Sequence, residues 1–132
     1  MSRRQLREQI FKLLFRVEFN SKDELEQQEA FFFADEENHA GEEENAEIGE
    51  KFGKIVERLD EIDMELNQKA KGWSTDRMGK VDLTILRLAV YEIQHDDEVP
   101  TGVAINEAVE LAKKFGQDSS PAFINGVLAK FA

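Results

Sequence analysis

The residues whose chemistry stands out first form a basic cluster beside an aromatic side chain near the start of the chain. The cluster comprises Arg3, Arg4, Arg7 and Lys12, and Phe15 follows it. Cationic side chains can neutralise nucleic-acid phosphates, and an aromatic ring can stack on an unpaired base. The alternative interpretation is that the cations form a solvated helix face and that Phe15 belongs to the core. The residues alone leave both interpretations open.

The overall charge argues against a polyanionic partner, but its distribution does not. The 132 residues carry a formal net charge of −11, whereas binding to phosphates requires positive charge. Most of the excess lies between Glu18 and Glu50, where Lys22 is the only lysine or arginine. Fields of exposed charges fade over ~8 Å at physiological salt. A local basic face is therefore compatible with an acidic protein.

No catalytic signature is present in the sequence. The segment Gly49–Lys54 resembles a phosphate-binding loop but is one residue short, and Ile55 follows where a hydroxyl would be needed. His39 and His95 have no partner at ligand spacing, and cysteine is absent. No apolar run is long enough to span a bilayer. We expect a cytoplasmic protein that is not an enzyme and needs no cofactor or metal.

Apolar residues recur every three or four positions, which indicates amphipathic helices. The pattern predicts an all-α fold of about seven helices in two packed bundles, within a single domain of residues 1–132. Residues 48–66 read as one amphipathic segment with a break near Asp60, where a second helix can be capped. An alternative is that this heptad-like segment is a coiled coil that makes the protein a helical dimerisation module.

The early part of the chain carries helix-start signals and then an acidic segment. Ser2 with Gln5 forms a capping box for a first helix, and Ser21 or Asp23 can cap a second. Residues 35–47 lack apolar periodicity and are rich in carboxylates, which predicts a mobile acidic loop. The alternative is an electrostatic gate that competes for the basic face.

The segment from residue 81 to 93 is apolar nearly all round, as expected of a central helix. Its polar side chains form one stripe, which we expect to face solvent or a partner: Thr84, Arg87, Tyr91 and Gln94. Gly116 predicts the end of the next helix, Pro121 the start of the last one. Gly126 predicts a close helix approach.

Three segments together resemble the NusB family of bacterial transcription antitermination factors. They are SRRQLREQIFKLLF at residues 2–15, RMGKVDLTILRLAVYEI at 77–93 and VPTGVAINEAVELAKKFGQDSSPAFINGVL at 99–128. The resemblance implies an RNA-binding surface made by the first helix, the last helix and the loop before it. Carried over by position, that surface comprises Arg3, Arg4, Arg7, Lys12, Phe15, Asp118, Ser119 and Phe123.

The resemblance also implies a surface for a protein partner, the small-subunit ribosomal protein known as NusE. Its candidates are Trp73, Asp76, Asp82, Arg87 and Tyr91, although Trp73 can equally cover one end of the core. The implied function is regulation of transcription termination: with NusE, the protein would hold single-stranded boxA-type RNA on elongating RNA polymerase. The alternatives are a detached targeting domain of an RNA methyltransferase and a homodimeric helical module.

Overall fold

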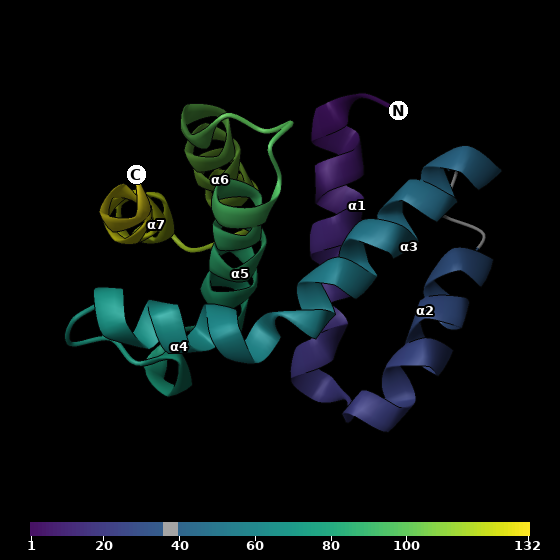
Figure 1. Cartoon of the computed structure of the whole chain (residues 1–132), viewed down its shortest axis with the longest axis horizontal. Helices are drawn as coiled ribbons and strands as arrows, with labels where there is room; N and C mark the ends of the chain where they lie inside the picture. Colours follow the sequence, from purple (N-terminus) through teal and green to yellow (C-terminus); the bar gives the residue numbers. More distant parts are fainter. Residues whose placement is uncertain (36–39) are drawn as a thin grey trace. The chain divides into compact units, whose positions relative to one another are not determined.

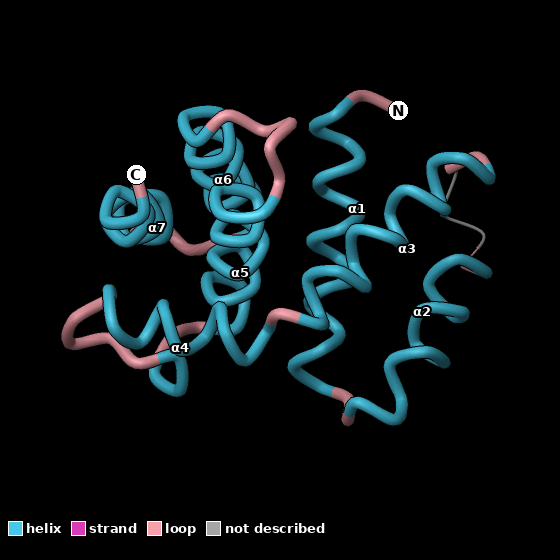
Figure 2. Tube along the Cα trace, in the orientation of Figure 1, coloured by secondary structure: helices cyan, strands magenta, loops and turns pink. Residues whose placement is uncertain are grey.

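The structure is a computed structural model that describes residues 1–35 and 40–132 (Figures 1 and 2). These ranges hold seven α-helices with short 3-10 turns and no strand, so the predicted all-α class is confirmed. The chain forms two compact units, residues 1–56 and residues 57–132. That residues 1–132 act as one domain stays a prediction. No described helix is long and apolar enough to cross a membrane.

The first unit contains three helices. They are α1 (Arg3–Phe15), α2 (Leu25–Ala34) and most of α3 (Glu42–Glu57). The capping box at the start of α1 is confirmed: the Gln5 N–H donates to Ser2 Oγ at 3.1 Å, and the Ser2 N–H donates to Gln5 Oε1 at 2.8 Å. A second capping box, between Ser21 and Glu24, precedes α2. Leu13, Leu14, Ile48, Phe52 and Ile55 are buried.

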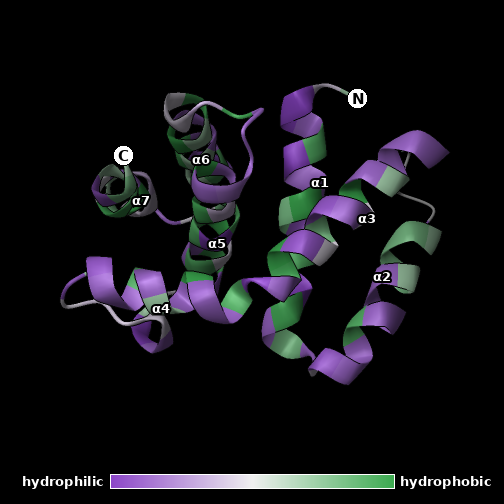
Figure 3. Cartoon of the chain, viewed as in Figure 1, coloured by the Kyte–Doolittle hydropathy of each residue, from purple (hydrophilic) through white to green (hydrophobic). Residues whose placement is uncertain are grey.

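The predicted acidic loop is wrong for residues 42–47, which form the first turns of α3. These turns are strongly hydrophilic (Figure 3). Three glutamates occupy the first turn, where carboxylates interact favourably with the helix dipole. The Gly41 N–H also donates to Glu44 Oε1 at 3.1 Å. A dense run of acids is therefore compatible with a helix start. Residues 36–39 of the expected loop lie outside the described residues.

The second unit contains the other four helices. They are α4 (Leu59–Lys69), α5 (Lys80–His95), α6 (Thr101–Phe115) and α7 (Ser120–Leu128). The last three pack on one another, and α4 packs on α5. The break predicted near Asp60 is confirmed, although Arg58 is the N-cap of α4 and Asp60 lies in its first turn. Because the helix is interrupted there, a continuous coiled coil over residues 48–66 is wrong.

The expected exposure of the polar stripe on α5 is wrong for three of its four members. Thr84, Arg87 and Tyr91 are 0%, 8% and 6% exposed, and Gln94 alone of the four is exposed. Thr84 Oγ1 donates to the Lys80 carbonyl oxygen at 2.8 Å, and Arg87 pairs with Asp63 of α4. Polar side chains that have partners of this kind can be buried without leaving unmade hydrogen bonds.

Two glycines near α7 differ in what surrounds them. Gly116 caps the end of α6, and a Cβ there would lie 2.6 Å from Ser120 Oγ and 2.8 Å from the Ala112 carbonyl oxygen. The turn between α6 and α7 is therefore too tight for any side chain at Gly116. A Cβ at Gly126 would meet nothing within 4 Å, so the close helix approach predicted there is wrong. Pro121 lies in the first turn of α7, as predicted.

Candidate functional site

The predicted cations of α1 do not all share one face of the helix. Arg3, Arg4 and Lys12 are exposed, whereas Arg7 is only 9% exposed. With 3.6 residues per turn, Arg4 and Phe15 lie on the same side of α1, and Arg3 and Lys12 lie on opposite sides. Lys12 is also 3.9 Å from Glu8. The four cations therefore lie on different sides of α1, and Arg4 is on the side of Phe15 but about 16 Å from it along the helix axis.

Phe15 belongs to a row of aromatic rings and is half-buried. Its ring centroid lies 6.2 Å from that of Phe11 and 5.1 Å from that of Phe19, which it meets edge-on. Phe11 is buried, and Phe19 is 61% exposed. Phe19 lies in the 3-10 turn Arg16–Phe19 that follows α1. It was missed in the sequence, although the four-residue spacing Phe11–Phe15–Phe19 is a signal that the three rings can contact one another. The row therefore continues from the core to solvent.

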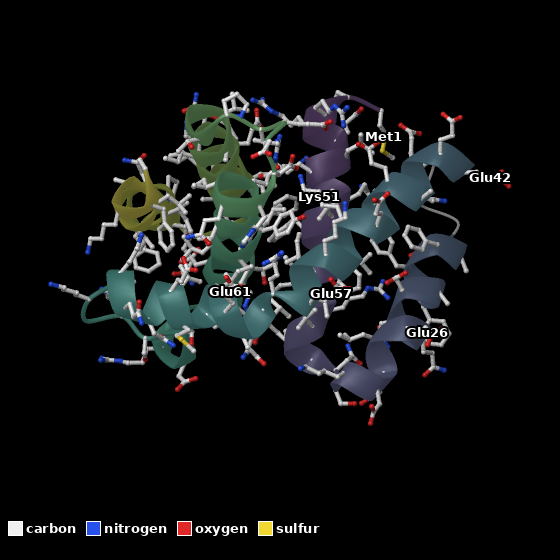
Figure 4. The ribbon with its side chains drawn as sticks, viewed as in Figure 1. Met1, Glu26, Glu42, Lys51, Glu57 and Glu61 are labelled. Carbon is white, nitrogen blue, oxygen red and sulfur yellow. The ribbon has the colours of Figure 1, made fainter. Side chains whose placement is uncertain are left out.

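Acidic residues at the start of α3 pair with positive groups at the start of α1. Arg3 Nη1 lies 2.5 Å from Glu47 Oε1, and both side chains are exposed. The ammonium of Met1, labelled in Figure 4, lies 2.6 Å from Glu44 Oε2. That hydrogen bond, followed by the one from the Gly41 N–H, lowers the pKa of Glu44. Acids of the segment expected to be a loop therefore compete for positive charge in α1.

The second unit contains a groove of about 560 Å³ between the starts of α5 and α7. It brings together four predicted residues that are far apart in the sequence, two from the RNA set and two from the partner set: Ser119, Phe123, Trp73 and Asp82. We call it the aromatic groove. Its other lining residues were not singled out in the sequence: Met78, Gly79, Lys80, Val81, Phe115, Gly116, Gln117 and Ser120.

Trp73 and Phe123 form the aromatic pair of this groove. Their ring centroids lie 5.5 Å apart with an interplanar angle of 69°, an edge-on arrangement. Trp73 is 51% exposed, so it is not simply a cover for the core. Such a pair can support stacking of a further flat ring.

Polar groups surround the aromatic pair. The α5 and α7 helices both begin at the groove, with Gly79 and Ser119 as N-caps that lack a side-chain cap bond. Helix N-termini carry partial positive charge. The Gln117 N–H donates to Ser120 Oγ at 3.0 Å, which holds the turn before α7. Asp82 Oδ1 is enclosed and receives no hydrogen bond from the described part of the chain.

The remaining predicted partner residues do not form one exposed patch. Arg87 is held by two hydrogen bonds to Asp63, and the buried Tyr91 ring lies 5.7 Å from the ring of His95. Asp76 is exposed in the 3-10 turn Thr75–Arg77. Asp118 is likewise exposed, in the turn before α7. Among the described residues, no group of three or more metal-ligating side chains is placed to hold a metal ion.

The sequence was compared with models of known protein families and with curated proteins. The model of the NusB family matches residues 4–132. The chain belongs to the NusB family. It is 54% identical to the transcription antitermination protein NusB of Agathobacter rectalis over 132 residues, 100% of each chain.

Solved structures of NusB proteins have the same fold. The NusB structure from T. maritima matches with a TM-score of 0.88 and 34% identity, covering 100% of this chain and 91% of that one. One chain of a crystal structure of the antitermination factors NusB and NusE in complex with double-stranded RNA is also similar, with a TM-score of 0.79 and 25% identity. The match covers 98% of this chain and 94% of that one.

Proposed function

We propose that the protein is a non-enzymatic antitermination factor that binds single-stranded boxA-type RNA together with the ribosomal protein NusE. It would act in the cytoplasm by holding this RNA on elongating RNA polymerase. Membership of the NusB family supports the proposal, as does the similarity to a chain crystallised with NusE and RNA. The observation that carries it is the aromatic groove, where Trp73 and Phe123 lie beside Lys80 and two helix starts.

Each unit supplies groups suited to single-stranded RNA. In the first unit, Arg4 and Phe15 lie on the same side of α1, and the ring of Phe15 contacts the exposed ring of Phe19. In the second unit, Phe123 and Ser119 line the aromatic groove. Positive charge that tracks the backbone, combined with rings that stack on bases, is the usual basis of single-strand binding. Neither unit requires a catalytic group for this function.

The ribosomal partner is proposed to bind the second unit near the 3-10 turn Thr75–Arg77. Asp76 is exposed there, and Met64 of the neighbouring helix α4 is 61% exposed. Arg87 would act indirectly, because its guanidinium holds the Asp63 carboxylate in place. Tyr91 would likewise support the surface from within. Tethering by two binding surfaces raises the affinity of the assembly above that of either contact alone.

The test is filter binding of a short single-stranded boxA-type RNA to the full chain, with and without the ribosomal protein. We expect binding by the chain alone that weakens with salt and tightens when the ribosomal protein is added. A scrambled RNA of the same length and base composition is the control. Equal binding of both RNAs, or no gain on adding the ribosomal protein, contradicts the proposal.

A further inference from the structure

We infer that the aromatic groove is a slot for one unpaired RNA base, and that the Asp82 carboxylate selects guanine there. The inference rests on the proposed RNA-binding function and deepens it. It assigns Trp73 and Asp82 to the RNA, whereas the resemblance to the NusB family made both candidates for the protein partner. The assignment follows from the groove itself, since the same cavity is lined by Phe123 and Ser119.

The aromatic pair provides the stacking surface. In an edge-on pair, the ring that presents its edge keeps its own faces clear of the other ring. Trp73 and Phe123 meet at 69°, and half of Trp73 is exposed. A base that enters the groove therefore finds an uncovered ring face, and every base has a face that can stack on it. The groove volume of about 560 Å³ is within the usual range of small-molecule sites.

Asp82 provides the selectivity. It is the third residue of α5 and lines the groove, and its Oδ1 atom receives no hydrogen bond from the described residues. An enclosed acceptor without a donor is unfavourable, so a ligand that brings a donor is favoured. The last torsion of an aspartate is broad, so rotation of the carboxylate can bring both oxygens to the groove.

Guanine matches this carboxylate better than the other bases. Its N1–H and N2–H donors lie side by side on the Watson–Crick edge, and an ionised carboxylate offers two acceptor oxygens. Uracil presents a single N–H between two carbonyl oxygens, which the carboxylate repels. Adenine and cytosine each present an amino group next to a ring acceptor. A two-point hydrogen bond is therefore available to guanine alone among the four.

The surroundings offset the cost of bringing RNA phosphates near an acid. Lys80, two residues before Asp82, also lines the groove, and α5 and α7 both begin there. Positive charge and helix dipoles of this kind favour phosphate groups. The carboxylate can therefore read the base edge while the lysine lies near the backbone.

The test uses the full chain and its single tryptophan, which is Trp73. The probes are short oligouridines that carry one guanine, one inosine or no substitution. Inosine keeps N1–H but lacks the N2 amino group. We expect Trp73 fluorescence to be quenched on binding and the guanine RNA to bind on the order of tenfold more tightly than the inosine RNA. The comparison needs only the unaltered chain, so it does not depend on how a variant folds.

Variants then locate the reading group. Asp82→Asn should reduce the guanine-to-inosine ratio to near one, with unchanged helical content. Asp97→Asn is the matched control, because Asp97 is an exposed acid that does not line the groove, and it should keep the full ratio.

Three outcomes would overturn the inference. One is equal binding of guanine and inosine RNA by the unaltered chain. Another is a ratio that survives Asp82→Asn. The third is loss of ribosomal-protein binding by Asp82→Asn while RNA binding and Trp73 fluorescence stay unchanged, which would make the groove a protein surface. In each case RNA binding in the filter assay leaves the proposed function standing, whereas failure of boxA-type RNA to bind at all would overturn both.

Discussion

Arg87 of α5 and Asp63 of α4 form a two-point ion pair. Nε donates to Oδ1 at 2.9 Å and Nη2 donates to Oδ2 at 2.7 Å. The Arg87 side chain is 10% exposed and that of Asp63 is 24% exposed. This geometry ties α4 to the central helix and explains why Arg87 is not a free surface residue. Loss of this ion pair is therefore expected to lower the stability of the fold.

Arg87→Met should lower the free energy of unfolding by about 2–3 kcal/mol, because it leaves Asp63 partly buried without its charged partner. Urea unfolding of the full chain measures the effect. The double variant Arg87→Met/Asp63→Leu should recover part of the loss, since no unpaired carboxylate remains. Unchanged stability together with weaker binding of the ribosomal protein would instead make Arg87 a direct interface residue.

Glu47→Gln should strengthen RNA binding, because it releases Arg3 from the 2.5 Å ion pair. Each phosphate neutralised on a single strand changes the slope of log affinity against log salt by about −0.7. Four α1 cations would give a slope of about −3, and three cations, without the buried Arg7, would give about −2. The variant should make the measured slope steeper.

The matched control for Glu47→Gln is Glu50→Gln. Glu50 lies on the same helix but pairs with Lys54, at 3.1 Å. Its substitution should leave the salt slope unchanged. If both variants tighten binding equally, the effect comes from the net charge of the protein, and Glu47 does not compete with RNA for Arg3.

Asp118→Asn should leave the melting temperature unchanged and tighten RNA binding at low salt. Ser119, not Asp118, is the N-cap of α7, and Asp118 is exposed. The substitution therefore removes a negative charge that repels RNA phosphates, and it leaves the N-cap of α7 in place. Asp97→Asn, at an exposed turn position, is the control. Unaltered affinity for Asp118→Asn would place the RNA away from the turn before α7.

Phe123→Ala should weaken RNA binding by ~1–3 kcal/mol, the usual contribution of one stacked base. The loss should be similar for guanine and inosine RNA, because a ring face does not read the base edge. Filter binding at one fixed salt concentration measures it. An RNA affinity equal to that of the unaltered chain would remove Phe123 from the RNA surface.

Gly116→Ala and Gly126→Ala should change stability in opposite directions. At Gly116 the new Cβ would meet Ser120 and the Ala112 carbonyl, and we expect a loss of about 1–3 kcal/mol, as for other overpacked sites. At Gly126, within α7 and with open space around it, alanine should add roughly 0.5–1 kcal/mol through its helix propensity. Thermal unfolding of both variants tests this, and a stable Gly116→Ala protein would contradict the tight turn.

Glu29→Gln should stabilise the protein at neutral pH but not in acid. Burial, and then the neighbouring carboxylate of Glu26, raise the pKa of Glu29. A raised carboxyl pKa contributes stability that is complete below the unfolded-state pKa and is lost as pH rises through the folded-state value. At neutral pH the charged Glu29 therefore costs stability that glutamine does not.

Melting temperatures of Glu29→Gln and the unaltered chain should converge as pH falls below the ordinary glutamate pKa of about 4.3. Glu57→Gln, at an exposed position of α3, is the control. A stability difference for Glu29→Gln that does not vary with pH would show that loss of the charge is not its cause.

Local features of the fold could be predicted from the sequence because they depend on neighbours along the chain. The capping box at Ser2 and Gln5 and the break between α3 and α4 are signals of this kind. The apolar character of α5 also predicted its burial. The loop predicted for the acidic segment was wrong from Glu42 onward. A helix can start without apolar periodicity, because carboxylates in its first turn stabilise it. The family itself was evident from three segments of ordered residues.

The composition of the candidate site was decided by tertiary structure. Arg87 is polar in the sequence, but its burial depends on Asp63, which lies 24 residues away. Trp73 and Phe123 are separated by 50 positions and meet only because the turn before α5 lies against the start of α7. Helix periodicity predicts which residues share a face, but it does not predict which distant helix covers that face. Long-range packing therefore decides which polar residues are structural and which remain free to bind RNA.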